Sequence, residues 1–141
     1  MDKYEPKGFA RGALAVSHEK DADWDDGLRD YFAYRDLGMM EKTGGKLRAH
    51  VIRPSGPCKE QGDQHYHKVD FQMIYVLKGW VRFVYHVEDA DGGETEVREC
   101  KFGPGDCCLQ PPGILHNELE CSDDLELIEI TSPAAYETVA E

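Results

Sequence analysis

Short segments of alternating apolar and polar residues, separated by glycine- and proline-rich turns, make up most of this 141-residue chain. Alternation with period two indicates half-buried strands, and no long amphipathic helix interrupts the series. Roughly seven or eight such strands predict an all-β sandwich or barrel built as one domain. The segments are "KLRAHVIR", "FQMIYVL", "WVRFVYHV", "TEVRECK", "CCLQ", "PPGILHNELE" and "DLELIEIT", and the turns include "PSGPCKEQGD", "EDADGGE" and "FGPGD".

The N-terminal part of the chain does not follow this pattern. Residues 1–27 are polar, charged and without period, so we expect an irregular N-terminal arm there and a single barrel domain over residues 28–141. In the region that follows, "DYFAY" favours a strand and "DLGMMEKTGG" favours a turn. Near the C-terminus, the alternation of "SDDLELIEI" slips by one position at Leu127 and Ile128, which we interpret as a bulged strand.

Charge and cysteine content exclude several classes of protein. Sixteen basic residues against 28 acidic ones give a net charge of -12, which argues against nucleic acid or an anionic membrane as a partner. No run approaches the ~20 apolar residues of a membrane span, and the N-terminus lacks the apolar stretch of a signal peptide. The five cysteines are odd in number and show no CxxC spacing, so we expect free, mostly buried thiols and a cytoplasmic location.

Two histidines precede the central strands in "GDQHYHKVDFQMIYVLKG". In an extended segment His65 and His67 project from the same face, where two imidazoles form half of a transition-metal site; a pair of surface histidines is the alternative. Gln72 lies five residues after His67, so only a turn or bulge at "KVD" brings it to the same side. There it is either a metal ligand or a core glutamine that is hydrogen-bonded to the backbone.

A third histidine follows a rigid turn. In "GDCCLQPPGILHNELE" the Pro-Pro-Gly sequence can aim the next strand, and with it His116, into the interior. With the preceding segment, this stretch resembles the paired motifs of the cupin superfamily. The first motif matches at His65, His67, Gln72 and Gly79, and the second matches at Gly105, Pro111, Gly113 and His116.

The resemblance implies a jelly-roll barrel (a double-stranded β-helix) with one metal ion per chain near its centre. Carried over to this sequence, the metal ligands would be His65, His67, Gln72 and His116, a set that suits a divalent transition metal such as Fe, Mn, Ni or Zn. Three positions depart from the motifs: the leading glycine is displaced to Gly62, Gln72 stands in place of a glutamate, and Glu120 in place of an asparagine.

Such a ligand set predicts a metal-dependent enzyme. Four protein ligands on an octahedral ion leave two positions for substrate and dioxygen or water, so we expect a dioxygenase-like oxygenase. Because Gln72 is neutral, the metal charge is not compensated by its ligands, which favours a small anionic or enolisable substrate. A non-oxidative isomerase or lyase is a variant of this hypothesis. The alternative is a cupin that binds or senses a small molecule and catalyses nothing.

Other polar residues are assigned more broadly. Glu120 is a candidate catalytic base, or the acceptor for the second N–H of a ligand histidine. Four basic or histidine side chains on strands could reach a substrate anion: Arg48, His50, Arg82 and His86. The preferred interpretation is that they lie on a face of the barrel exposed to solvent. We also expect a homodimer, because "MIYVL" and "WVRFV" supply more apolar positions than one barrel face needs.

Overall fold

The computed structural model describes residues 4–25, 31–58 and 63–141. The expected boundary between arm and barrel, at residues 27 and 28, and Gly62 of the first motif lie outside the described residues. Two short helical turns and ten strands follow one another along the described chain: η1 Glu19–Asp21, β1 Phe32–Asp36, α1 Met39–Lys42, β2 Arg48–Pro54, β3 His65–His67, β4 Phe71–Lys78, β5 Val81–Glu88, β6 Thr95–Phe102, β7 Cys107–Leu109, β8 Leu115–Cys121, β9 Glu126–Ser132 and β10 Thr138–Ala140.

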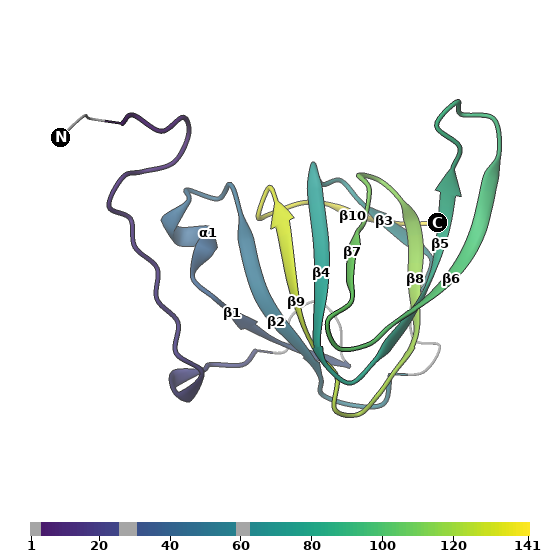
Figure 1. Cartoon of the computed structure of the whole chain (residues 1–141), viewed down its shortest axis with the longest axis horizontal. Helices are drawn as coiled ribbons and strands as arrows, with labels where there is room; N and C mark the ends of the chain where they lie inside the picture. The colour runs from purple at the N-terminus through teal and green to yellow at the C-terminus, as the bar shows by residue number, and fades with distance from the viewer. Residues whose placement is uncertain (1–3, 26–30, 59–62) are drawn as a thin grey trace.

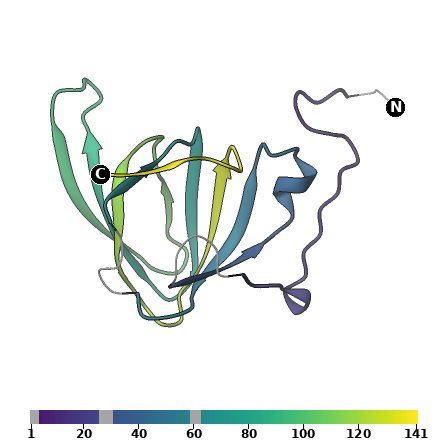
Figure 2. The same cartoon turned by 180° about the vertical axis from the view of Figure 1, so that it is seen from behind.

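The strands form two five-stranded antiparallel sheets that face each other (Figure 1). One sheet has the order β1-β2-β9-β4-β7 and the other has the order β10-β3-β8-β5-β6. From β2 to β5, and again from β6 to β10, each strand lies in the opposite sheet from the one before it, which winds the chain into a double-stranded β-helix. The view from behind in Figure 2 shows the same two walls around a common interior. The prediction of an all-β jelly-roll barrel is confirmed.

The inner face of the first sheet changes from polar at one end to apolar at the other. His50 of β2 pairs with Glu129 of β9, and one step along the same face Ile52 pairs with Leu127. On β4 the buried series begins with Gln72 and continues with Ile74 and then Val76. Burying an aliphatic side chain stabilises the fold by about 1.5–3 kcal/mol, so the apolar end holds the sheets together. The polar end is therefore available for a functional site.

The local predictions are confirmed in most places. "DYFAY" contains β1, and "DLGMMEKTGG" contains the four-residue helix α1 within a turn. The interpretation of "SDDLELIEI" as a strand bulged at Leu127 and Ile128 is wrong, because β9 pairs without a shift from Leu127 to Thr131 along both β2 and β4. The register shift between β4 and β9 lies between Val76 and Lys78, so the extra residue, Leu77, belongs to β4. The alternation slips instead because Ile128 and Ile130 lie on the outer face while the inward position between them is taken by the charged Glu129.

The arm and the outer face of the first sheet expose large apolar side chains. Residues 4–24 run beside the barrel and are irregular apart from the short turn η1, and a backbone bridge from Asp25 to Tyr34 ties the end of this segment to β1 (Figure 1). Exposed apolar residues lie on β4 and β7: Phe71, Tyr75, Leu77 and Leu109. The homodimer stays a prediction. Among the described residues there is no helix long and apolar enough to cross a membrane.

All five cysteines are free thiols in the structure, and their environments differ. We expect all five to titrate as thiols in denatured protein prepared without reductant, whereas recovery of three or one would reveal disulfides. In native protein Cys107 should react first with a thiol reagent, because it is exposed. Cys58 and Cys121 should react slowly because they are buried. Burial also raises the pKa of Cys108 and so lowers its share of reactive thiolate.

Candidate metal centre

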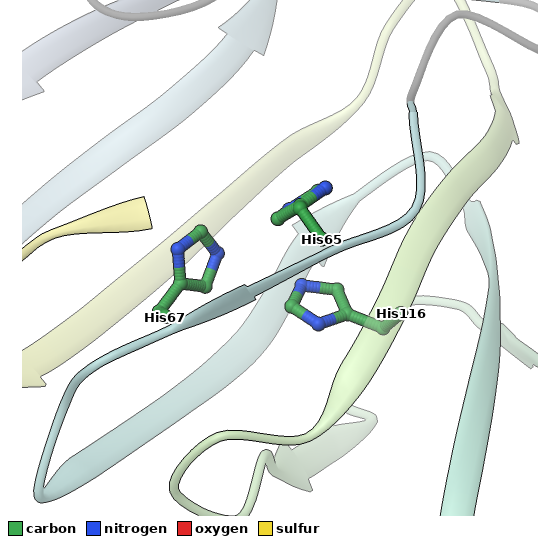
Figure 3. Close-up of side chains that lie close together, drawn as sticks. All are labelled: His65, His67 and His116. Atoms are coloured by element: carbon green, nitrogen blue, oxygen red, sulfur yellow. The ribbon is translucent and has the colours of Figure 1, made fainter. Parts of the chain in front are cut away.

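Three histidines converge inside the barrel from two neighbouring strands. His65 and His67 lie on β3, and His65 pairs directly with His116 on β8. One ring nitrogen of each histidine lies within 4.8 Å of those of the other two, and Figure 3 shows the three rings gathered between the strands. His65 is 2% exposed and His116 is 1% exposed. The period-two spacing of "HYH" and the antiparallel register are therefore sufficient to build the cluster.

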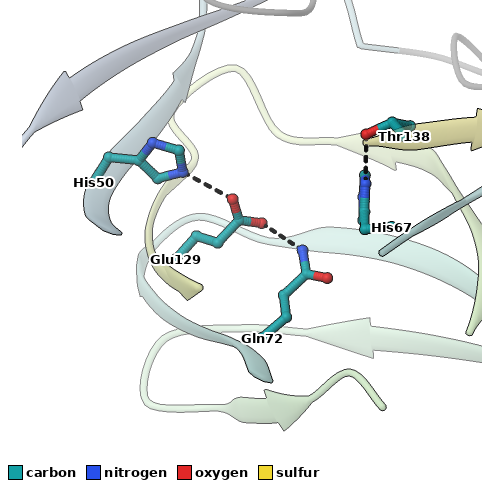
Figure 4. Close-up of polar contacts among 5 residues, drawn as sticks. All are labelled: His50, His67, Gln72, Glu129 and Thr138. Atoms are coloured by element: carbon teal, nitrogen blue, oxygen red, sulfur yellow. Dashed lines mark hydrogen bonds and ion pairs between the residues drawn. The ribbon is translucent and has the colours of Figure 1, made fainter. Parts of the chain in front are cut away.

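Hydrogen bonds fix the orientation of each ring. The Nδ1 atoms of His65 and His116 lie 2.6 Å and 2.9 Å from the backbone carbonyl oxygens of Asp63 and Ile114. Because a carbonyl oxygen only accepts, these Nδ1 atoms carry the proton, and in the neutral rings the lone pair is on Nε2. His67 is held in a similar way, with its Nδ1 atom 2.8 Å from the Thr138 hydroxyl on β10 (Figure 4). Such contacts are the usual support of metal-binding imidazoles.

The charge state of the cluster suits a cation. Burial lowers the pKa of His116, against the opposing effect of the Ile114 carbonyl, so this ring is neutral at neutral pH. Transition metals bind imidazole nitrogens at about 2.0–2.1 Å, so nitrogens within 4.8 Å of one another can reach a single ion after small side-chain rotations. Three imidazole nitrogens this close together are a set of donors that fits a divalent transition metal.

Gln72 lies next to the cluster in the opposite wall. The loop at residues 68–70 carries the chain from β3 into the other sheet. This change of sheet turns Gln72 into the interior, as we expect if a turn at "KVD" brings it to the side of the histidines. The side chain is 2% exposed. Its amide nitrogen donates a hydrogen bond of 3.0 Å to Glu129 Oε2, so its partner is a carboxylate rather than the backbone (Figure 4).

Glu129 is the centre of a short hydrogen-bonded chain. Its Oε1 atom accepts from His50 Nε2 at 2.8 Å, while its Oε2 atom accepts from Gln72. Burial raises the pKa of Glu129, but the hydrogen bond and positive charge of His50, together with the Gln72 amide, outweigh burial and hold the pKa below the ordinary glutamate value. Glu129 is therefore ionised although its side chain is only 14% exposed.

A bulge in β8 determines which glutamate of this strand enters the interior. Phe83 pairs with Glu118 and the adjacent Arg82 pairs with Glu120, so Leu119 is an extra residue on β8. Glu118 consequently shares the inward side with Phe83, and its Oε2 atom is buried with no hydrogen-bond partner among the described residues. Glu120 lies on the outer side in an ion pair of 2.9 Å with Arg82. The catalytic role of Glu120 stays a prediction.

The histidine cluster opens onto a cavity of about 500 Å³. A smaller cavity of about 30 Å³ adjoins it and is lined by His116, Gln72 and residues of the apolar core. Glu118 and Glu129 line both cavities. The charged and histidine side chains around the larger cavity are Asp25, Asp36, Arg48, His50, His65, His67, Glu118 and Glu129.

The structure thus brings together the four side chains that the cupin resemblance implies, and it adds others that sequence reasoning did not place. His50 and Arg48 line the cavity instead of a solvated face, whereas Arg82 and His86 lie on the outer side of β5. The break in the alternation of apolar and polar residues at Leu127 and Ile128 of β9 was the only feature of the sequence that pointed to an unusual position at Glu129. Glu118 lies two residues after His116, but nothing in the sequence marks the bulge that separates it from Glu120.

Comparison with known proteins agrees with this architecture. No protein-family model matches the sequence, and no curated protein matches it. Among solved structures, oxalate decarboxylase from Bacillus subtilis is similar, with a TM-score of 0.65, 16% identity, and coverage of 96% of this chain and 34% of that chain. The enzyme from Lactobacillus farciminis gives a TM-score of 0.61 at 16% identity, over 90% of this chain and 35% of that one.

A third structure, HppE in its Fe(II) form, gives a TM-score of 0.62 at 13% identity, over 87% of this chain and 62% of that chain. The chain spans about a third of the length of the oxalate decarboxylases, so the likeness concerns the fold. The Bacillus subtilis enzyme is described with Mn(II) centres. The two-sheet barrel, the position of its histidine cluster and these neighbours lead to one conclusion: the chain has the cupin fold, with a cluster of three histidines inside it that could hold a metal ion.

Proposed function

We propose that this protein is a metal-dependent enzyme, and specifically a dioxygenase-like oxygenase that acts on a small molecule with one ionised or enolisable oxygen. The observation that carries the proposal is the orientation of the cluster: the carbonyl contacts at Nδ1 make Nε2 the metal-binding atom of His65 and of His116, and His65 and His67 line a cavity large enough for a small molecule. A divalent Fe or Mn ion would supply Lewis acidity and redox chemistry there.

The cavity walls narrow the class of substrate. Among the residues that the structure describes, four carboxylates line the larger cavity (Asp25, Asp36, Glu118 and Glu129), against one guanidinium, Arg48. Such a wall repels a multiply charged anion but admits a neutral enolisable molecule or a monoanion that Arg48 can pair with. Aromatic and apolar side chains also line this cavity and suit a compact, partly apolar molecule: Phe32, Tyr34, Met40, Ile52 and Tyr136.

Metal content and oxygen consumption test this function directly. Protein purified without a polyhistidine tag should contain about one divalent transition metal per chain. Loaded with Fe(II) or Mn(II), it should consume dioxygen when it is supplied with a member of a panel of 1,3-diketones, catechols and 2-oxo acids. A loaded protein that converts a panel member without consuming dioxygen would indicate the isomerase or lyase instead.

A binding or sensing module is the second candidate, and Gln72 is the observation that favours it. A neutral amide in place of a carboxylate weakens the hold on a metal, so the cavity could serve a small ligand alone. Ligand-dependent thermal stabilisation of metal-free protein, with no turnover of the same compound by the metal-loaded protein, would support this candidate. The anionic partner and the homodimer remain proposals under both functions.

A further inference from the structure

We propose that Glu129, held in place by His50, is a positioning residue that determines which end of the Gln72 amide faces the histidine cluster. The effect is to make Gln72 an oxygen donor toward the metal. This inference rests on the proposed metal site, but it concerns ligand orientation rather than the reaction.

The hydrogen-bonding chemistry of the three side chains allows only one arrangement. A carboxylate accepts hydrogen bonds, an amide NH₂ group donates them, and an amide oxygen accepts them. Both oxygens of Glu129 are used, at 2.8 Å from His50 and 3.0 Å from Gln72. Turning the Gln72 amide by 180° would place its oxygen against Glu129 Oε2 and leave two acceptors facing each other in a buried site.

The sheet fixes this arrangement before any metal binds. His50, Glu129 and Gln72 lie on three adjacent strands, β2, β9 and β4, and all three side chains point inward. His50 is directly opposite Glu129, and Gln72 is two residues from Ile74, the β4 residue that pairs with Glu129. Figure 4 shows the amide nitrogen of Gln72 turned to Glu129 and its oxygen on the side of His67.

The orientation matters because an amide binds a hard or borderline cation through its oxygen. The amide nitrogen has no free lone pair and would present two N–H groups to the cation. A carboxylate at position 72 would need no such control, since either of its oxygens can bind. The glutamine therefore requires an acceptor on the far side of its amide, and Glu129 is that acceptor.

An exchange of donor and acceptor tests the inference. The proteins are the wild type, Glu129→Gln, Gln72→Glu, the double variant Gln72→Glu/Glu129→Gln, and the control Glu99→Gln. The control removes a carboxylate of β6 that pairs with Arg82 and does not line either cavity described above. The measurements are Co(II) affinity by titration calorimetry, the visible absorption of bound Co(II), and urea unfolding of the metal-free proteins.

We expect Glu129→Gln to bind Co(II) roughly tenfold to hundredfold more weakly, because the new amide can donate to Gln72 and turn its oxygen from the metal. Gln72→Glu places a carboxylate, a stronger metal ligand than an amide, at this position. Its gain in Co(II) affinity should be small, because the new carboxylate then faces the carboxylate of Glu129. In the double variant the new amide at position 129 can donate to the new carboxylate at position 72, so Co(II) affinity should return at least to that of the wild type. Glu99→Gln should bind as the wild type does.

The outcomes separate the two proposals. A folded Glu129→Gln variant with wild-type affinity and an unchanged Co(II) spectrum overturns the positioning role, as does a double variant with no rescue. If Glu129→Gln does not fold, the Co(II) affinity of the double variant tests the positioning role instead. A double variant that does not fold, or that does not bind Co(II), also overturns the inference. A wild type that binds no Co(II) overturns both proposals. A wild type that binds and shows rescue, but consumes no dioxygen, supports the positioning role and rejects the oxygenase.

Discussion

His116→Ala is expected to lower the affinity for a divalent metal by roughly hundredfold to thousandfold while the barrel still folds. Structural zinc sites of four ligands bind with about 10–16 kcal/mol, so one ligand contributes about 2.5–4 kcal/mol, and each ~1.4 kcal/mol is a factor of ten. His116 is the most deeply buried of the three histidines, and its Nδ1 atom is already held by a carbonyl.

The measurement is metal content after dialysis, together with titration of the metal-free protein. His86→Ala is the matched control, because His86 lies on the neighbouring strand β5 but on the outer, half-buried side. The control should keep its metal. Far-ultraviolet circular dichroism should show strand content in both variants. If His116→Ala kept a full complement of metal, His116 would not be a ligand.

Gly79→Ala is expected to lower the free energy of unfolding by about 2–5 kcal/mol. Gly79 makes the turn between β4 and β5 with a φ of +73°, which alanine adopts only with strain. A Cβ atom there would overlap Ser122 Oγ and lie 2.8 Å from the backbone Cα of Leu125, which cannot move aside as the end of a side chain can. The estimate combines about 1–3 kcal/mol of backbone strain with a similar cost of overpacking.

Gly92→Ala separates the two contributions. Gly92 has nearly the same φ, +71°, but nothing lies within 4 Å of the position of an added Cβ. This variant should therefore show the backbone strain alone, about 1–3 kcal/mol. Urea unfolding followed by tryptophan fluorescence measures both, and Trp80 beside the turn provides a local signal. Equal losses in the two variants would contradict the close packing of the β4–β5 turn against Leu125.

The class of fold and the three clustered histidines can be predicted from the amino-acid sequence alone. Alternation with period two identifies strands because side chains of an extended chain alternate between faces, and turn residues mark where each strand ends. The same rule places His65 and His67 together, and the Pro-Pro-Gly turn points to His116. These are local properties of the backbone, so they can be read without knowing which strands pair.

The polar residues around that cluster depend on how distant strands pair, which the sequence does not reveal. Glu129 meets Gln72 because β9 lies between β2 and β4, an order that the sequence of strands does not reveal. Glu118 turns inward and Glu120 outward because the pairing of β8 with β5 places one extra residue in β8. A shift of one residue in a strand exchanges its two faces. Register is set by contacts between distant segments, and for this reason local patterning could not distinguish the glutamates inside the barrel from those on its surface.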